Sequence, residues 1–271
     1  MNRPAVGEHA RDGTADEPPH TLPGRRPPAL PAALAAATVL AQVVYPLAPD
    51  RALAALTITT VLLFCGASVT HVAATRGWAA AGRFLIVAAG VGLLAESLGV
   101  HTGVPFGSYD YTDRLGAQLW GVPAVVPLAW AMMAWPALVV GRALGAPALL
   151  GGLALASWDL FLDPQMVDAG FWIWHRSGPA LNGIPLVNTL GWAVVGVALV
   201  GGLDRLLPRR PSAYDDALPL ALWAWTYASS VLANLAFFSR PGVALVGGLG
   251  MGAVAALLAR RLLSGAPAAG W

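Results

Sequence analysis

The sequence predicts an all-α, polytopic integral membrane protein, and three observations predict it. Of the 271 residues, 57% are hydrophobic and 11% are charged, whereas soluble domains carry about 25% charged residues. The apolar residues fall in runs of about 20, the length that crosses roughly 30 Å of hydrocarbon as a helix. The basic residues, all of them arginines, are concentrated in alternate connections between these runs.

Eight apolar runs are expected to be transmembrane helices: 30–48, 52–75, 80–100, 121–141, 147–163, 185–203, 217–238 and 242–263. The fifth run is the shortest, so seven spans is the alternative. Residues 1–28 are rich in proline and carry both signs of charge. We therefore expect a disordered cytoplasmic tail there, a single transmembrane domain over 29–263, and a short C-terminal tail over 264–271.

The arginines test this topology. With eight spans, twelve of the 16 fall on one side of the membrane and four on the other, namely Arg51, Arg114, Arg176 and Arg240. Cytoplasmic connections carry the excess of basic residues, so the sequence predicts a multi-pass protein of the cell membrane with both termini in the cytoplasm. The arginines stand singly or in pairs rather than in a stripe, so no nucleic-acid partner is expected. A single cysteine, Cys65, excludes a disulfide framework.

Two connections on the outer side are longer than hairpins. Residues 101–120 and 164–184 are rich in Gly, Pro and aromatic residues and carry few charges. This composition predicts segments that fold back onto the bundle at the membrane interface, where Trp and Tyr are favoured. Pro164 is expected to end the preceding helix. Long loops in an otherwise tight chain are usually functional.

An ordered pattern is shared by two units, residues 90–145 and 153–207. Each unit reads acid, aromatic-x-aromatic, Gly-[Val/Ile]-Pro and Trp, which are Glu96, Tyr109, Tyr111, Pro123 and Trp130 in the first and Asp159, Trp172, Trp174, Pro185 and Trp192 in the second. The sequence therefore predicts an internal duplication of a two-helix unit, with the copies related by an axis along the membrane normal. Chance matches in a chain rich in Gly and Trp are the alternative, which the ordered succession disfavours.

The acids and amides of the spans gather near the predicted outer ends of the helices. Ionisable side chains inside spans are costly and usually face a cavity or a partner, and Asp159 and Asp163 are spaced to share one helical face. For any single acid, solvation at the interface is the alternative. We expect one outer pocket to contain Glu96, Asp159, Asp163, Asp110, Tyr109, Tyr111, Trp130, Trp172, Trp174, Asn188, Trp192, Asn234 and His101.

Several classes of chemistry fit these residues poorly. A zinc or di-iron site needs several His and carboxylates at ligand spacing, and the chain has five His, two of them in the N-terminal tail. Nucleotide cofactors need Gly-rich strand–helix loops. Asp159 and Asp163 have the spacing of a prenyltransferase motif, but the second acidic motif is missing. A transporter places its polar groups near the midplane. Acid–base chemistry on a lipid-soluble substrate, without cofactor or metal, remains.

The chain resembles the carotenoid biosynthesis membrane protein family of bacteria and archaea over residues 30–260. The segments that carry the resemblance are Glu96–Gly103, Pro105–Tyr111, Gly121–Pro123, Pro127–Trp130, Asp159–Met166, Gly170–Trp174, Gly183–Asn188 and Gly191–Trp192. The family includes carotenoid hydratases, so the resemblance implies addition of water across the terminal 1,2 double bond of an acyclic (ψ) carotenoid end, giving a tertiary alcohol. It brings no assignment of catalytic residues.

The predicted pocket suits that reaction. Protonating an isolated alkene requires an acid that stays protonated near neutral pH, and burial of a carboxyl group favours this form. We expect Asp159 or Glu96 to be the acid, and Asp163 or Asp110 to be the base that places the water. The aromatic faces would stabilise a tertiary carbocation, and the amides would position the reacting groups.

The expected partners are a lipid-soluble carotenoid, water, membrane lipid and other enzymes of the carotenoid pathway. Two other classes of function stay open on the sequence. One is a different acid-catalysed end-group enzyme, a cyclase or isomerase, and the other is a non-catalytic carotenoid or lipid carrier. Product mass separates them, because only hydration adds one water molecule.

Overall fold

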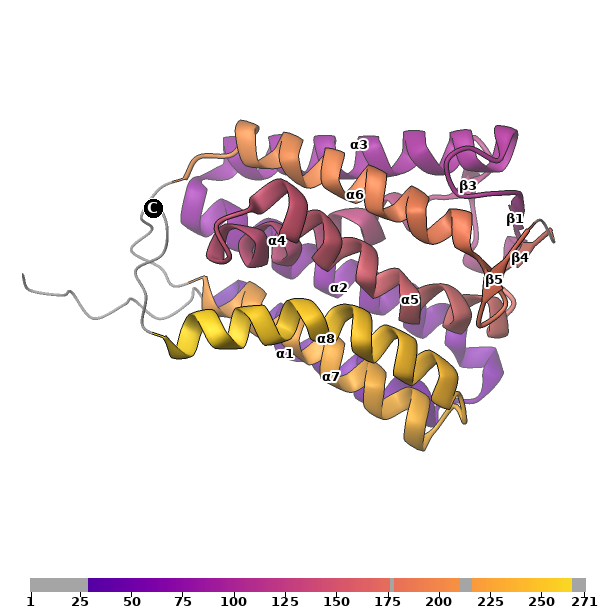
Figure 1. The fold of residues 1–271 in the computed structure, drawn as a ribbon. Helices are drawn as coiled ribbons and strands as arrows, with labels where there is room; N and C mark the ends of the chain where they lie inside the picture. Colours follow the sequence, from indigo (N-terminus) through magenta and orange to yellow (C-terminus); the bar gives the residue numbers. More distant parts are fainter. Residues whose placement is uncertain (1–28, 176–177, 210–215, 265–271) are drawn as a thin grey trace, which may run out of the picture.

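The computed structural model describes residues 29–175, 178–209 and 216–264, which form a bundle of eight α-helices (Figure 1). The helices are α1 (Ala29–Val44), α2 (Asp50–Arg76), α3 (Trp78–Thr102), α4 (Val126–Ala143), α5 (Gly152–Asp168), α6 (Leu186–Leu206), α7 (Ala217–Ala236) and α8 (Pro241–Leu263). The described chain thus has the eight helices that the sequence predicts. The predicted tail over 1–28 and residues 265–271 lie outside the described residues.

Six of these helices are long and apolar enough to cross a membrane: α1, α2, α3, α4, α6 and α8. The architecture is that of an all-α polytopic membrane protein. Shorter helical turns join the long helices at three places, η1 (Tyr45–Leu47), η2 (Asp113–Leu115) and η3 (Pro147–Gly151).

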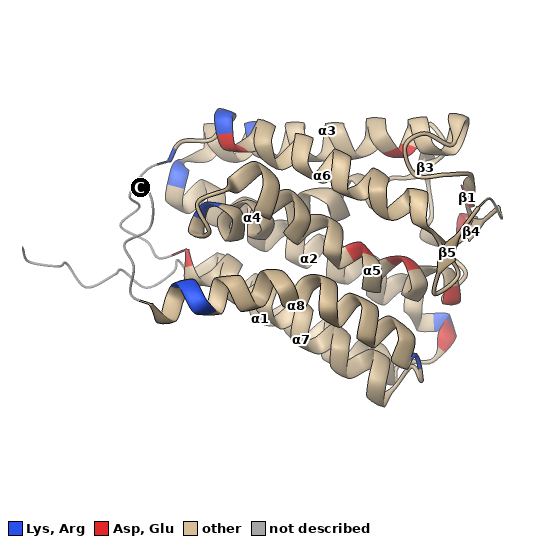
Figure 2. Ribbon diagram, in the orientation of Figure 1, with Lys and Arg blue, Asp and Glu red and all other residues tan. Residues whose placement is uncertain are grey.

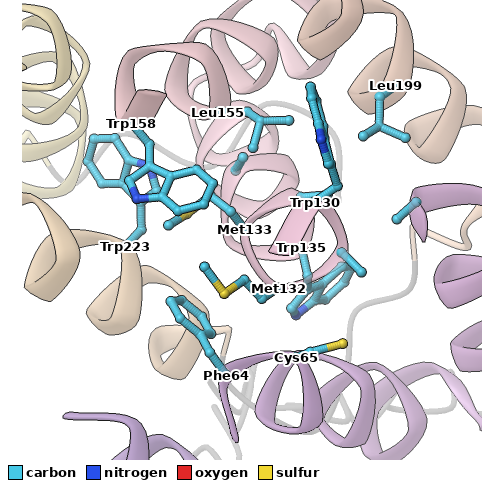
Figure 3. Close-up of a cluster of buried hydrophobic side chains, with 14 of the residues drawn as sticks. Phe64, Cys65, Trp130, Met132, Met133, Trp135, Leu155, Trp158, Leu199 and Trp223 are labelled. Atoms are coloured by element: carbon cyan, nitrogen blue, oxygen red, sulfur yellow. The ribbon is translucent and has the colours of Figure 1, made fainter. Parts of the chain in front are cut away.

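Helix α4 is the centre of the bundle. Nearly all of its side chains are buried, as expected for a helix that is apolar on every side. Figure 3 shows Trp130, Met132, Met133 and Trp135 of α4 surrounded by side chains of α2, α5, α6 and α7. Helix α4 therefore packs against helices α2, α5, α6 and α7 at the same time.

Helix α5 differs from the prediction at its end. Pro164 lies inside the helix, which continues to Asp168, so the expected stop at Pro164 is wrong. Proline removes one backbone donor, but the N–H groups of Ala169 and Phe171 still bond to carbonyls of the last turns, at 3.1 and 3.0 Å. Asp163 is consequently held within the helix rather than at its end.

Small residues bring α5 close to α6. A Cβ on Gly152 would lie 2.5 Å from the backbone Cα of Val197, and a Cβ on Gly196 would lie 2.8 Å from the carbonyl oxygen of Gly152. Close backbone packing of this kind holds helices together in lipid. It fixes α5, which carries Asp159 and Asp163, against α6, which carries Asn188.

Short strands lie at one end of the bundle, which we call the outer end (Figure 1). Strand β1 (Tyr109–Tyr111) pairs with β4 (Trp172–Trp174) in antiparallel register, with Tyr109 opposite Trp174 and Tyr111 opposite Trp172. Two hairpins flank this pair: β2 (Gln118–Leu119) with β3 (Val122–Pro123), and β5 (Ala180–Leu181) with β6 (Ile184–Pro185). The two long connections thus fold back onto the bundle as expected.

The two halves of this region repeat each other. Each runs helix, strand, hairpin, helix, and each hairpin turns through two residues with positive φ, Trp120–Gly121 and Asn182–Gly183, the geometry of a type I′ turn. Residues that the sequence pattern matches, such as Tyr109 with Trp172, are paired crosswise in β1 and β4. A twofold axis through the strand pair produces this register, in agreement with an internal duplication.

Both ends of the bundle carry charged residues (Figure 2). Opposite the strands lies what we call the inner end, where the last turns of α2, α4, α6 and α8 carry Arg76, Arg142, Arg205 and Arg260. Glu96, Asp159 and Asp163 lie toward the outer end. These four arginines of the described chain therefore lie at the end where the sequence predicts the excess of basic residues.

Candidate active site

A cavity lies at the outer end, between helices α2 to α6 and the β1–β4 pair. Its wall is mostly apolar and aromatic, with a few carboxyl and amide groups. Most of the residues expected in one pocket line it: Glu96, Tyr109, Tyr111, Trp130, Asp159, Asp163, Trp172, Trp174, Asn188 and Trp192.

Glu96 of α3 is buried and accepts hydrogen bonds from three neutral donors. The Tyr109 and Tyr111 hydroxyls donate to Oε2, the latter at 2.9 Å, and Trp130 Nε1 donates to Oε1 at 2.9 Å. Gly99 makes room for this arrangement, because a Cβ there would lie 2.8 Å from the Tyr109 hydroxyl. The carboxyl group is fixed in position without any basic residue.

Asp159 and Asp163 are joined by one amide. Asn188 Nδ2 donates to Oδ2 of each aspartate at 2.7 Å. The indole N–H groups of Trp172 and Trp174 donate to Asp163 Oδ1 at 2.6 and 2.9 Å. Within the described chain, Asn188 is the one side chain that donates to Asp159. Oxygen Oδ1 of Asp159 is consequently the least engaged carboxyl oxygen of the group.

Aromatic rings surround the three acids. Trp130 and Trp192 stack face to face, with ring centroids 4.0 Å apart and planes 6° from parallel. Trp158 meets the edge of Trp192 at 6.1 Å, and Tyr109 packs on Trp174 at 4.8 Å. Ring faces attract cations, by about 0.5 to 2 kcal/mol each. The cavity can therefore stabilise a positive charge that develops within an apolar molecule.

The tyrosines of β1 are held in their neutral form. Burial raises the pKa of Tyr109 and Tyr111, and the neighbouring Glu96 carboxyl raises the pKa of both further. A phenol with a raised pKa stays protonated at and above its usual range, near pH 10. Both hydroxyls thus remain hydrogen-bond donors to Glu96 over the physiological range.

The structure places three of the expected residues outside the cavity wall. Alternation along β1 turns Asp110 away from Tyr109 and Tyr111, and its exposed carboxyl lies 2.7 Å from His175 Nε2. His101 is exposed, with Nδ1 2.8 Å from the Ser97 carbonyl oxygen. Asn234 is buried in α7 and donates to the Ser230 carbonyl oxygen at 2.9 Å.

Some residues that line the cavity are not among those expected from the sequence. Trp158, Leu162 and Met166 follow one another at helical spacing beside Asp159 and Asp163. That period of four is the signal that could have placed them in the pocket. Thr57 and Val61 also line it, but no motif in the sequence brings α2 to this site.

Among the described residues, no three His, Cys, Asp or Glu side chains are grouped as metal ligands would be. Independence from a cofactor stays a prediction.

Comparisons with known proteins show what the chain is similar to. The profile of a family described as "Carotenoid biosynthesis protein" matches residues 53–261. The chain is similar to bisanhydrobacterioruberin hydratase of Haloarcula japonica, with 35% identity over 145 residues, 47% of this chain and 49% of the relative. The match thus spans about half the length of that curated relative. No solved structure matches the chain.

Proposed function

Because the chain belongs to the carotenoid biosynthesis protein family, we propose that it hydrates the end of an acyclic carotenoid. Water adds across the terminal 1,2 double bond of a ψ end group and gives a tertiary alcohol. One observation carries the proposal above all: three buried carboxyl groups line one aromatic cavity, and all their hydrogen-bond donors are neutral side chains.

In the first step Asp159 protonates C2 of the terminal double bond, which leaves a tertiary cation at C1. We assign this role to Asp159 because its Oδ1 is the least engaged carboxyl oxygen in the cavity. Proton transfer by a positioned carboxyl group contributes about 10²- to 10⁴-fold to such a rate. Asn188, which joins Asp159 to Asp163, keeps the acid in place.

The cation is stabilised by the ring faces and by Glu96. The stacked Trp130–Trp192 pair and Trp174 line the same cavity as the three acids. Glu96 is held by three donors, so it does not reorient as charge develops. Preorganised groups of this kind stabilise a charged intermediate most effectively in a dry site.

In the second step a water oxygen bonds to C1, and Asp163 accepts the proton that the water loses. Asp163 remains fixed by Trp172 and Trp174 while it does so. The proton that Asp163 gains balances the one that Asp159 gave, and exchange between these neighbours through water resets the site. Asp110 lies outside the cavity wall, so the proposal gives it no role.

The position of the cavity suits a substrate dissolved in the bilayer. We propose that the inner end faces the cytoplasm, since it carries most of the described arginines, and that both termini lie on that side. A long polyene that spans the membrane then brings one end to the outer cavity. Membrane lipid and other carotenoid-pathway enzymes are the remaining proposed partners.

The test uses purified protein, lycopene in detergent micelles and H₂¹⁸O as solvent. Hydration is expected to give a tertiary alcohol that carries the ¹⁸O label, and Asp159→Asn is expected to abolish it. A product with the mass of the substrate but a new ring or shifted double bond would instead identify a cyclase or isomerase. Unchanged pigment that co-purifies with the protein would identify a carrier.

A further inference from the structure

A second cavity adjoins the first, among helices α1, α2, α4, α5 and α7. The two share part of their walls. Figure 3 labels four residues of the second wall: Phe64, Met132, Met133 and Trp158. The residues that line both cavities are Thr57, Val61, Met132, Trp158, Leu162 and Met166.

The second cavity has a more hydroxyl-rich wall than the first. Polar side chains come from four helices and from η1: Gln42, Tyr45, Thr57, Thr60, Gln165, Thr226, Ser229 and Ser230. The hydroxyl of Thr60, a residue only 9% exposed, has no hydrogen-bond partner in the described chain. A hydroxyl buried in a membrane protein without a partner is unfavourable.

We propose that this second cavity is a water chamber that supplies the reactant water to the acid cavity; the inference rests on the proposed hydration. A buried water needs two to four polar partners, and a cavity lined by several hydroxyl and amide groups can supply them. Thr57 stands at the junction, on both walls, with its hydroxyl 3.5 Å from the Tyr45 hydroxyl.

Water explains this wall better than the polyene does. Covering the Thr60 hydroxyl with hydrocarbon leaves it unpaired and costs free energy, whereas water satisfies it; Thr226 and Ser229 already donate to backbone carbonyl oxygens. The first cavity, whose wall is aromatic and apolar apart from its acids, suits the carotenoid end. With the carotenoid end in one cavity and water in the other, the cation can form in a dry site and then react with water from the adjoining cavity.

Water radiolysis on the unmodified protein tests the chamber without any assay of activity. Hydroxyl radicals oxidise methionines that lie next to water. Met133 and Met251 are both fully buried, but only Met133 of the two lines a described cavity. Mass spectrometry is expected to find Met133 oxidised several-fold faster than Met251. If Met133 and Met251 were equally protected from oxidation, the proposal that the second cavity holds water would be wrong, whether or not the protein is a hydratase.

Thr60→Val combined with Ser230→Ala then tests the supply of water. In D₂O the cation has two fates: capture by water, or loss of a proton that regenerates the alkene with deuterium in it. With less water at hand, the ratio of deuterated substrate to alcohol is expected to rise several-fold. Thr38→Val is the matched control, a fully buried threonine of α1 that lines neither cavity, and it should leave the ratio unchanged.

An unchanged ratio in the double variant would also overturn the proposal. If the variant in addition binds the carotenoid more weakly, the second cavity is part of the polyene site. Absence of alcohol with every variant and the wild type, together with rapid oxidation of Met133, would instead refute the proposed hydration and leave a hydrated chamber.

Discussion

The two ends of the bundle treat buried acids in opposite ways. At the inner end, Asp216 pairs with Arg76 at 2.8 Å and Asp204 pairs with Arg142 at 2.8 Å, with Arg209 as a further partner. At the outer end, the carboxyl groups of the cavity receive hydrogen bonds from phenol, indole and amide groups alone.

This difference separates a structural use of acids from a chemical one. An arginine neutralises a carboxylate and ties it into the fold, so the inner acids are unavailable for proton transfer. Neutral donors orient a carboxyl group but leave it free to give or take a proton. Because unpaired acids in a membrane are costly and usually functional, the outer end is where chemistry is expected.

The largest expected effect follows from removing the acid of the outer end. Asp159→Asn keeps an oxygen that can accept from Asn188, so folding should be retained, while hydration should fall by about 10²- to 10⁴-fold. Product formation from lycopene and thermal unfolding in detergent measure the two quantities. Wild-type turnover by both Asp159→Asn and Glu96→Gln would refute the assignment of acids to this cavity.

At the inner end, by contrast, a substitution should lower the stability of the protein rather than its activity. Arg142→Met removes the buried ionic partner of Asp204, a mostly buried residue, and leaves the exposed Arg209 as its remaining partner; the unfolding free energy should fall by about 3 kcal/mol. Denaturation followed by intrinsic fluorescence checks this, with activity expressed per folded molecule. The double variant Arg142→Met with Asp204→Leu should recover most of the loss. A drop in activity of the folded fraction would contradict the distinction between the ends.

A smaller effect is expected when one donor to Glu96 is removed. Tyr111→Phe leaves Tyr109 and Trp130 in place, and turnover should fall about tenfold, since a hydrogen bond to a charged group contributes roughly 1.5–3 kcal/mol. Because the pKa of Tyr111 is raised, wild-type activity should show no tyrosine titration up to about pH 10. An inflection below that pH that disappears in Tyr111→Phe would refute this account of the site.

The smallest effect is expected at the surface of the outer end. Asp110→Asn breaks an exposed pair with His175, and such pairs contribute about 0–1 kcal/mol. Turnover should stay within twofold of the wild type. Loss of hydration in this variant, comparable to that of Asp159→Asn, would return Asp110 to the catalytic group.

The sequence was sufficient where a residue's position follows from periodicity or repetition. Apolar runs predicted the helices, and the repeated pattern brought Glu96 and Asp159 to one end of the bundle. What it could not supply depends on tertiary packing. Asp110 alternates with two cavity residues yet faces away, and α2 reaches the cavity through Thr57 and Val61 without a motif. Pro164 stays helical because neighbouring backbone bonds continue around it.

The stacking of Trp130 on Trp192 is a contact between a residue and its own counterpart, as in the interface of a symmetric dimer. A backbone arranged in this way is alike in its two halves and does not itself distinguish them. The difference comes from side chains: at the same offsets, Asp163 and Asn188 correspond to Val100 and Val126 in the other half. In the proposed mechanism, the polar groups that make one half differ from the other therefore lie at these few unmatched positions.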